Sequence, residues 1–533
     1  MRKDDSIVKS KILCNPFFGS FSSQKSRWLL IGVLIVAAIL RLWASWQPVE
    51  VLVTKNLPDD AFYYFALAHN TANLGSVTTD GISPTNGFHP LWLISILPLF
   101  GRFSPGAELP IHLALTLASF LDLASIWLIA RLAADLTRRW EAGILAAWLY
   151  AINPIVILQI TNGLETALGI FTLMAFLFLV KQWLTEKPKS RFSLLVGFLG
   201  GLMFLARSDS VFLFALAMVT ALWVWRNKSG LKKVLLASIA ALFVVSPWLI
   251  WSQMTVGNPI QESGLAVPFA IRARLALQQG GDWRLFLGES LAQLSNAAVW
   301  LRGDFSGLPL IVGIAVWGVV VFGLLRKWTV PGSRTEKLIL LPLLGSVVAL
   351  IVFHAGIRWF PRPWYFVPAA IAFALCFAVV AGDYLHKPKI ILPATAVITV
   401  YFLFAGILFW QVGLYPWQKQ MLAANDWLSE NIPPQAVVAS FNAGIYSYYN
   451  DFRVVNLDGV VNHNAYEAVQ QREILPYMQG SQVDFLIDFD SVIWREYAPF
   501  MGTGFPDSLQ AVATVSRELS PDLGFLRLYR VVR

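Results

Sequence analysis

Long apolar blocks constrain the fold of this 533-residue chain more than any other feature of its sequence. Three of them run over Trp28–Leu42, Ile311–Leu325 and Ile390–Trp410. A helix needs about 20 apolar residues to cross the hydrocarbon core of a bilayer, and several blocks meet or approach that length. Only 14% of the residues are charged, whereas a soluble protein has roughly a quarter. The sequence therefore predicts a polytopic membrane protein and excludes a soluble enzyme, a disordered chain and a disulfide scaffold.

The apolar blocks predict an all-α membrane bundle of about 11 spans plus a re-entrant helix. Basic residues collect in alternate connecting segments, which the positive-inside rule assigns to the cytoplasm. This pattern accounts for the net charge of +9 without a nucleic-acid partner. The apolar segment Pro90–Phe100 is too short to span, so we expect a re-entrant or interfacial helix there. The expected spans cover residues 27–46, 108–131, 141–160, 164–182, 191–208, 210–226, 233–251, 305–326, 337–355, 363–383 and 390–411.

This topology divides the chain into three parts. We expect residues 1–26 to form a cytoplasmic N-terminal tail and residues 27–411 a transmembrane domain whose first outer loop is 47–88. Residues 412–533 are expected to form a small extracytoplasmic α/β domain on the outer face of the plasma (inner) membrane. Its predicted elements are a helix over Trp417–Glu430 and strands over Ala436–Ser440, Arg453–Asp458, Asp484–Asp488 and Phe525–Val532.

An acidic pair opens a helix in the first outer loop. Asp59 and Asp60 follow Pro58, and this order fits the first turn of a helix, where the helix dipole favours carboxylates. Successive side chains on a helix point about 100° apart, so both acids cannot cap it and at least one is free to face a cavity. An ordinary helix start beside an interfacial aromatic belt is the structural alternative. An uncompensated acid at membrane depth indicates a functional site.

Further polar side chains converge on the same membrane face. Asn86 and His89 lie in a turn-rich segment before the short apolar block, where an imidazole beside free backbone N–H groups suits a phosphate. Taken singly, each polar residue is explained as a turn residue or an interfacial anchor. Arg41 is expected to snorkel, and Asp122 is the exception that lies in the middle of a span. The remaining candidates at the outer ends of spans are Glu165, Arg207, Asp209, Arg358 and Tyr365.

These residue types suit the transfer of a sugar from a lipid phosphate to a hydroxyl group. The lipid phosphate is already a good leaving group, so the reaction needs one carboxylate to take the proton of the acceptor hydroxyl. It also needs cations or N–H groups to hold the phosphate. Asp59 or Asp60 would be the base, and one displacement from the opposite face predicts inversion at the anomeric carbon. The phosphate contacts would come from His89, Arg207, Arg358 or Arg362. The residues expected to bind the donor are Asn86, His89, Glu165, Arg207, Asp209, Arg358 and Tyr365.

The chain resembles the GT-C superfamily of membrane glycosyltransferases, which includes protein O-mannosyltransferases and the aminoarabinose transferases of lipid A. The resemblance covers roughly residues 27–411. It implies polyprenyl-phosphate-sugar donors, an inverting mechanism and an acidic pair at the catalytic centre in the first outer loop. The segments that carry it are Asp59–Tyr64, Thr85–Trp92, Asn153-Pro154, Asn162–Glu165 and Arg207–Asp209.

Two departures from the superfamily leave the acceptor open. The pair is Asp-Asp rather than the Asp-Glu common in O-mannosyltransferases, and no MIR-like insertion is evident. The expected partners are therefore a polyprenyl-phosphate-linked sugar, an envelope lipid, glycan or protein as acceptor, and membrane lipids. No cofactor is required by the sequence, and a divalent metal at Asp59 and Asp60 is left open, since two carboxylates alone make a weak metal site.

Two other functions remain as alternatives. A transporter or flippase of a lipid-linked sugar predicts polar residues spread through the spans and often inverted repeats, whereas here the polar residues gather on one face. A non-catalytic assembly partner predicts that the acids serve only the helix start, so that replacing them costs about 1 kcal/mol per cap. The C-terminal domain is expected to cap the outer cavity and to help choose the acceptor.

Overall fold

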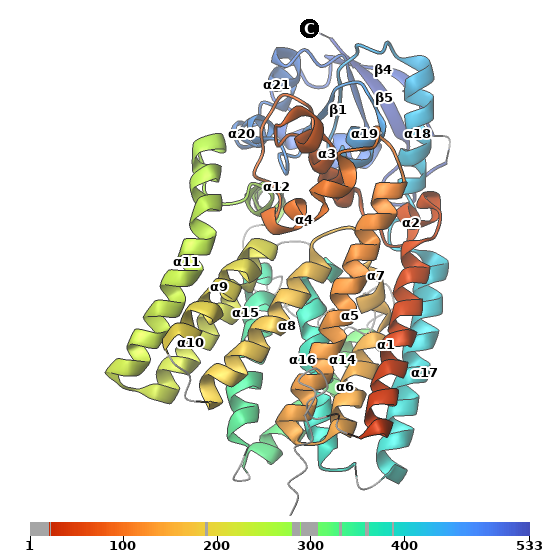
Figure 1. Cartoon of the computed structure of the whole chain (residues 1–533). Helices are drawn as coiled ribbons and strands as arrows, with labels where there is room; N and C mark the ends of the chain where they lie inside the picture. The colour runs from red at the N-terminus through yellow and green to blue at the C-terminus, as the bar shows by residue number, and fades with distance from the viewer. Residues whose placement is uncertain are drawn as a thin grey trace, which may run out of the picture.

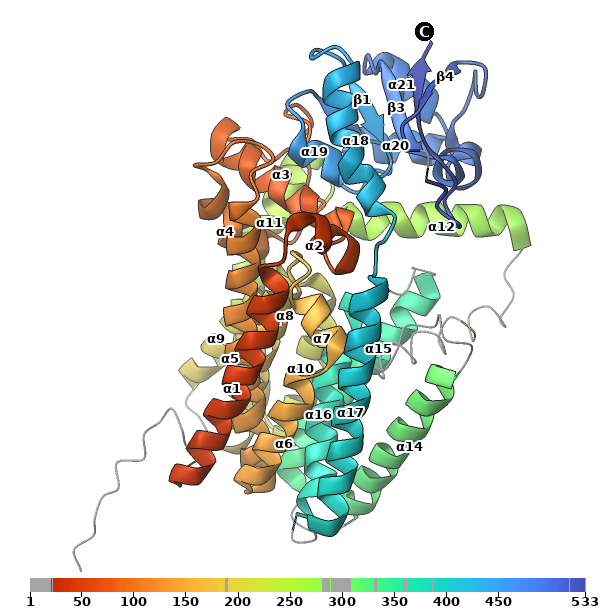
Figure 2. The same cartoon turned by 90° about the vertical axis from the view of Figure 1, so that its right-hand side faces the viewer.

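A computed structural model of the chain describes residues 21, 23–186, 190–279, 288, 308–329, 333–357, 362–385, 388–516 and 518–532. Long helices form a bundle that carries a smaller α/β domain at one end (Figure 1). Three helices lie between the bundle and this domain: α2 (Val49–Lys55), α3 (Asp59–Leu74) and α12 (Ser263–Gln279). Figure 2 shows α12 running crosswise to the bundle helices, beneath the α/β domain.

Within the described residues, each predicted span coincides with a helix of the bundle or with a bent helix pair, and residues 305–307 of one predicted span lie outside them. By length and composition, eight helices of the described residues could cross a membrane, and the pair α6–α7, bent by 66°, could make a ninth. The chain is therefore a multi-pass membrane protein, and its number of spans stays a prediction. The bundle helices are α1 (Gln24–Ser45), α5 (Leu109–Thr137), α6 (Trp140–Ala151), α7 (Pro154–Ile160), α8 (Thr166–Thr185), α9 (Ser190–Ala206), α10 (Val211–Trp225), α11 (Lys228–Val256), α14 (Leu308–Trp328), α15 (Arg334–Ile357), α16 (Val367–Gly382) and α17 (Pro388–Val412).

A buried polar cluster holds the bundle together where α6 breaks. Arg41 on α1 pairs with Asp122 on α5, with 2.5 Å between Nε and Oδ2, and donates to the carbonyl of Ala151, which ends α6. Tyr150 donates to the other carboxylate oxygen of Asp122. Arg41 and Asp122 are fully buried, so the prediction that Arg41 snorkels is wrong. The carboxylate of Asp122 gives the guanidinium a partner inside the bundle, which a buried charge requires.

The short apolar segment forms α4 (Pro90–Phe100), which begins at a proline. Eleven residues of helix are about 16 Å long, which is too short to cross a bilayer alone. The helix packs against α3, α5 and α9. Its length agrees with the re-entrant or interfacial helix expected there.

The C-terminal domain contains one five-stranded sheet of order β2-β1-β3-β5-β4. Strand β1 is parallel to β2 and β3, while β5 is antiparallel to both β3 and β4. The predicted helix and four predicted strands are confirmed, whereas β4 and the helices that follow β1 and β2 were not predicted. The elements are α18 (Gln418–Asn431), β1 (Val438–Ser440), α19 (Gly444–Tyr449), β2 (Val454–Asn456), α20 (His463–Gln471), α21 (Ile474–Gly480), β3 (Phe485–Phe489), β4 (Leu509–Thr514) and β5 (Leu526–Val531). The boundary at residue 412 stays a prediction.

Candidate active site

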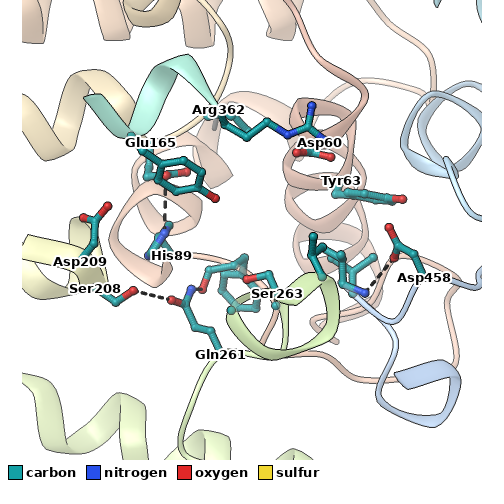
Figure 3. A pocket seen from close by; sticks show the side chains of 18 of the residues that line it. Asp60, Tyr63, His89, Glu165, Ser208, Asp209, Gln261, Ser263, Arg362 and Asp458 are labelled. Carbon is teal, nitrogen blue, oxygen red and sulfur yellow. Dashed lines mark hydrogen bonds and ion pairs between the residues drawn. The ribbon is translucent and has the colours of Figure 1, made fainter. Parts of the chain in front are cut away.

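A cavity of about 1260 Å³ lies between the bundle and the C-terminal domain. Asp60, Tyr63 and Asp458 lie on one side of it, and His89, Glu165 and Asp209 on the other (Figure 3). The bundle, the C-terminal domain, and α3 and α12 of the three intervening helices contribute to its lining. The candidate residues that line it are Asp60, His89, Glu165, Arg207, Asp209, Arg362 and Tyr365.

The structure separates the two members of the acidic pair. Asp60 lines the cavity, and within the described residues its carboxylate makes no hydrogen bond or ion pair. Burial raises the pKa of Asp60, and the nearby guanidinium of Arg362 opposes that shift. Asp59 is buried outside the cavity lining, and its carboxylate accepts hydrogen bonds from the backbone N–H groups of Gly444 (3.0 Å) and Ile445 (2.7 Å). Burial raises the pKa of Asp59 to about 7, and these two hydrogen bonds oppose the shift.

Asp59 is part of a larger contact between α3 and the C-terminal domain, which we call the α3 clamp. In this clamp the backbone N–H of Asp59 donates to Gln418 Oε1 (2.7 Å), and the hydroxyl of Tyr63 accepts from the backbone N–H of Ala443 (3.0 Å). Gly444 lies so close that an added Cβ would meet the backbone oxygen of Asp59 at 2.1 Å. The clamp therefore fixes the start of α3, and with it Asp60, against the C-terminal domain.

Glu165 organises the opposite side of the cavity. Its carboxylate pairs with Arg207 at 3.0 Å, accepts from the hydroxyl of Tyr64 at 3.0 Å, and lies 3.5 Å from His89 Nε2. Arg207 also pairs with Asp209 at 2.5 Å, so two carboxylates neutralise its charge. Burial lowers the pKa of His89. The charges on this side of the cavity therefore balance one another, which leaves little positive charge for a ligand.

Among the described residues that line the cavity, Arg362 is the cation without an ion pair, and it lies in the segment before α16. Arg362 extends over Asp60 in Figure 3 and makes no ion pair within the described residues. Its guanidinium lies 5.6 Å from the ring centroid of Trp364. The guanidinium of Arg207 lies over the ring of Tyr365, 5.1 Å from the ring centroid. The predicted residue Arg358 lies outside the described residues.

Asn86 does not line the cavity. Its side-chain amide is buried and donates to the backbone oxygens of Asn258 and Ile260, while its oxygen accepts from the backbone N–H of Glu262. The neighbouring Gln261 does line the cavity and accepts from the hydroxyl of Ser208 at 3.1 Å. Asn86 therefore positions the segment that leads into α12.

Asp458 is a lining residue that sequence reasoning missed. It follows β2, and its Oδ1 accepts from the backbone N–H of Val460 at 2.9 Å. Burial raises the pKa of Asp458 to about 7, and the charge of Asp60 adds to that shift. An acid directly after a parallel strand is the signal that could have found it, because the carboxyl ends of parallel strands commonly form ligand sites.

The acidic pair does not fit a shared divalent metal. Both oxygens of Asp59 accept backbone N–H groups, and Asp59 does not line the cavity that Asp60 lines. Among the described residues, no group of three or more His, Cys, Asp or Glu side chains is arranged to hold a metal ion.

The structure is a helical membrane bundle with a cavity at one end, and a separate α/β domain forms one wall of that cavity. Residues 88–251 match the family profile described as dolichyl-phosphate-mannose-protein mannosyltransferase, and residues 411–529 match that of a domain of unknown function, DUF8728. The chain therefore has the GT-C fold that its sequence resembles.

Solved structures agree with this assignment. The oligosaccharyltransferase of Archaeoglobus fulgidus, determined with zinc and sulfate, superposes with a TM-score of 0.56 at 16% identity, over 94% of this chain and 72% of that chain. ArnT from Cupriavidus metallidurans, bound to undecaprenyl phosphate, gives a TM-score of 0.56 at 12% identity, over 96% and 98% of the two chains. Comparison with curated proteins gave no significant match.

Proposed function

We propose that the protein is an inverting glycosyltransferase that moves a monosaccharide from a polyprenyl-phosphate donor to a hydroxyl group of an envelope lipid, glycan or protein. The observation that carries the proposal is the position of Asp60, a carboxylate without a hydrogen-bond partner among the described residues, in a large cavity beside the unpaired cation Arg362. The match to a lipid-phosphate-dependent mannosyltransferase family over residues 88–251 supports it. We place the cavity and the C-terminal domain on the outer face of the membrane, as the charge pattern of the loops predicts.

In the proposed reaction, Asp60 accepts the proton of the acceptor hydroxyl as its oxygen attacks the anomeric carbon of the donor sugar. The bond between that carbon and the phosphate oxygen breaks, and the lipid phosphate leaves as an anion. Arg362 stabilises the charge that develops on this phosphate. Because the attack comes from the face opposite the leaving group, the anomeric configuration inverts.

The apolar lining of the cavity suits the lipid part of such a donor. Val211, Phe212, Trp248, Phe353 and Ile357 line it on the bundle side. These side chains belong to helical segments that are long and apolar enough to cross a membrane. An isoprenoid tail could therefore pass from the bilayer to the cavity while its phosphate reaches Arg362.

The proposal is tested with purified protein in nanodiscs and a panel of radiolabelled polyprenyl-phosphate sugars. We expect the wild type to release the label from at least one donor, Asp60→Asn to abolish that release, and Asp507→Asn, which changes an exposed acid, to leave it unchanged. Release that continues unchanged in Asp60→Asn would contradict the assignment of the base. A donor that stays intact but crosses the bilayer would instead support a transporter or flippase.

A further inference from the structure

The C-terminal domain presents its own wall to the cavity. Four of its lining residues are Phe441, Asn442, Asp458 and Tyr497. Phe441 and Asn442 follow β1, and Asp458 follows β2, so they lie at the carboxyl ends of two parallel strands. Ligands of α/β sheets bind at these strand ends. This wall is therefore placed as a second binding surface, opposite the apolar side of the cavity that faces the bundle.

The charge on this wall is negative or neutral. Among the described lining residues, the C-terminal domain contributes the acids Asp458 and Glu496 and no Lys or Arg. Glu496 pairs with Arg274 of α12 at 3.1 Å, so the charge of this neighbouring cation is already neutralised. A phosphate bound against this wall would face Asp458 without a counter-charge, which is unfavourable for two like charges at a site of low dielectric constant.

The wall also carries a flat apolar surface next to its acid. The ring of Tyr497 stacks on the ring of Phe441 with centroids 4.0 Å apart and planes 17° apart. A sugar ring offers C–H groups that pack on an aromatic face and hydroxyl groups that donate to a carboxylate. Asp458 can accept such a bond, because a carboxylate has about four acceptor positions and the backbone N–H of Val460 and the side chain of Asn456 are the hydrogen-bond partners that it has among the described residues.

We propose that this wall is the acceptor subsite and that it takes a neutral, hydroxyl-bearing sugar ring rather than a phosphate-bearing one. In this arrangement Asp458 accepts a hydrogen bond from one hydroxyl while Asp60 takes the proton of a neighbouring hydroxyl, and Tyr497 packs against the ring. Figure 3 places Asp458 and Asp60 on the same side of the cavity, with Tyr63 between them. Asp458 takes no part in proton transfer. The inference rests on the proposed function, since it names the acceptor for the same cavity.

The structural alternative is that Asp458 only shapes the turn after β2, through its bond to Val460.

The test uses protein in nanodiscs, a donor that the wild type consumes, and two probes: a methyl hexopyranoside and its 6-phosphate. We expect sugar transfer to the neutral probe with a lower KM than to the phosphate. Asp458→Asn should raise the KM for the neutral probe about tenfold while the donor KM and kcat change little, which a turn-shaping role would not produce. Asp507→Asn is the matched control.

A charge reversal makes the test sharper. Asp458→Arg should shift the preference toward the 6-phosphate probe, because it supplies the cation that the wall lacks. An unchanged KM in Asp458→Asn, a wild-type preference for the phosphate, or donor consumption with no transfer to either probe would each overturn the inference. These results leave the proposed function standing, since consumption of the donor is measured in the same assay. A wild type that consumes no donor would instead contradict the proposed function itself.

Discussion

Gly444→Ala tests whether the α3 clamp is needed for catalysis. A Cβ at this position would lie 2.1 Å from the backbone oxygen of Asp59, whereas ordinary contact begins at 3.4 Å, so the two segments must separate by about 1.3 Å. The obstacle is backbone, which cannot turn away as a flexible side chain can. Asp60 follows Asp59 directly, and a misplacement of about 1 Å at a reacting group costs about 10²-fold in rate. We expect kcat to fall by about that factor.

The assay is release of labelled sugar from a donor that the wild type consumes, with kcat and donor KM measured separately. Donor KM should change little, because the apolar lining and Arg362 belong to the bundle side. Overpacking of this kind also destabilises by about 1–3 kcal/mol, so thermal unfolding is followed in parallel. Gly480→Ala is the control, since a Cβ there meets nothing within 4 Å. A folded Gly444→Ala variant with kcat within about threefold of wild type would refute the positioning role of the clamp.

Three further predictions concern single side chains. Asp60→Asn should lower kcat by about 10²–10⁴-fold with an unchanged melting temperature. Burial raises the pKa of Asp60, and the base acts when it is ionised. In a pH–rate profile, wild-type kcat should therefore decline as the pH falls, with a midpoint above 3.8. Arg362→Gln should raise the donor KM or lower kcat by about tenfold or more, since a charged hydrogen bond to phosphate contributes about 1.5–3 kcal/mol; equal kinetics in the two proteins would exclude the phosphate contact. Arg41→Met leaves Asp122 buried without its partner and should cost about 3–5 kcal/mol, seen as a lower melting temperature that Asp122→Asn partly restores.

The fold was predictable because its signals are local. Hydropathy located every bundle helix, and one helix followed by several short strands predicted the α/β domain. The number of spans is harder, because α9 has only 17 residues and α6 and α7 bend at Asn153-Pro154. The snorkelling assigned to Arg41 failed because its partner, Asp122, lies 81 residues away in the sequence.

The candidate site was predictable only in part. Acids and bases at the same end of the bundle helices lie on one face, so His89, Glu165 and Arg207 could be expected to meet. The separate roles of Asp59 and Asp60 could not be read from the sequence, because the difference arises from contacts with residues 443–445. Asp458 was not predicted as a cavity residue for the same reason, since its position in the cavity depends on how the C-terminal domain packs on α3.

The long range of the α3 clamp has a consequence for biogenesis. Asp59 is hydrogen-bonded to two residues that lie 385 and 386 positions later in the chain. It is therefore synthesised long before its partners. Until the C-terminal domain has been made and folded, the α3 clamp cannot form, and the cavity lacks the wall that this domain supplies. On the proposed function, a copy of the chain that lacks the C-terminal domain would therefore be inert toward lipid-linked sugars.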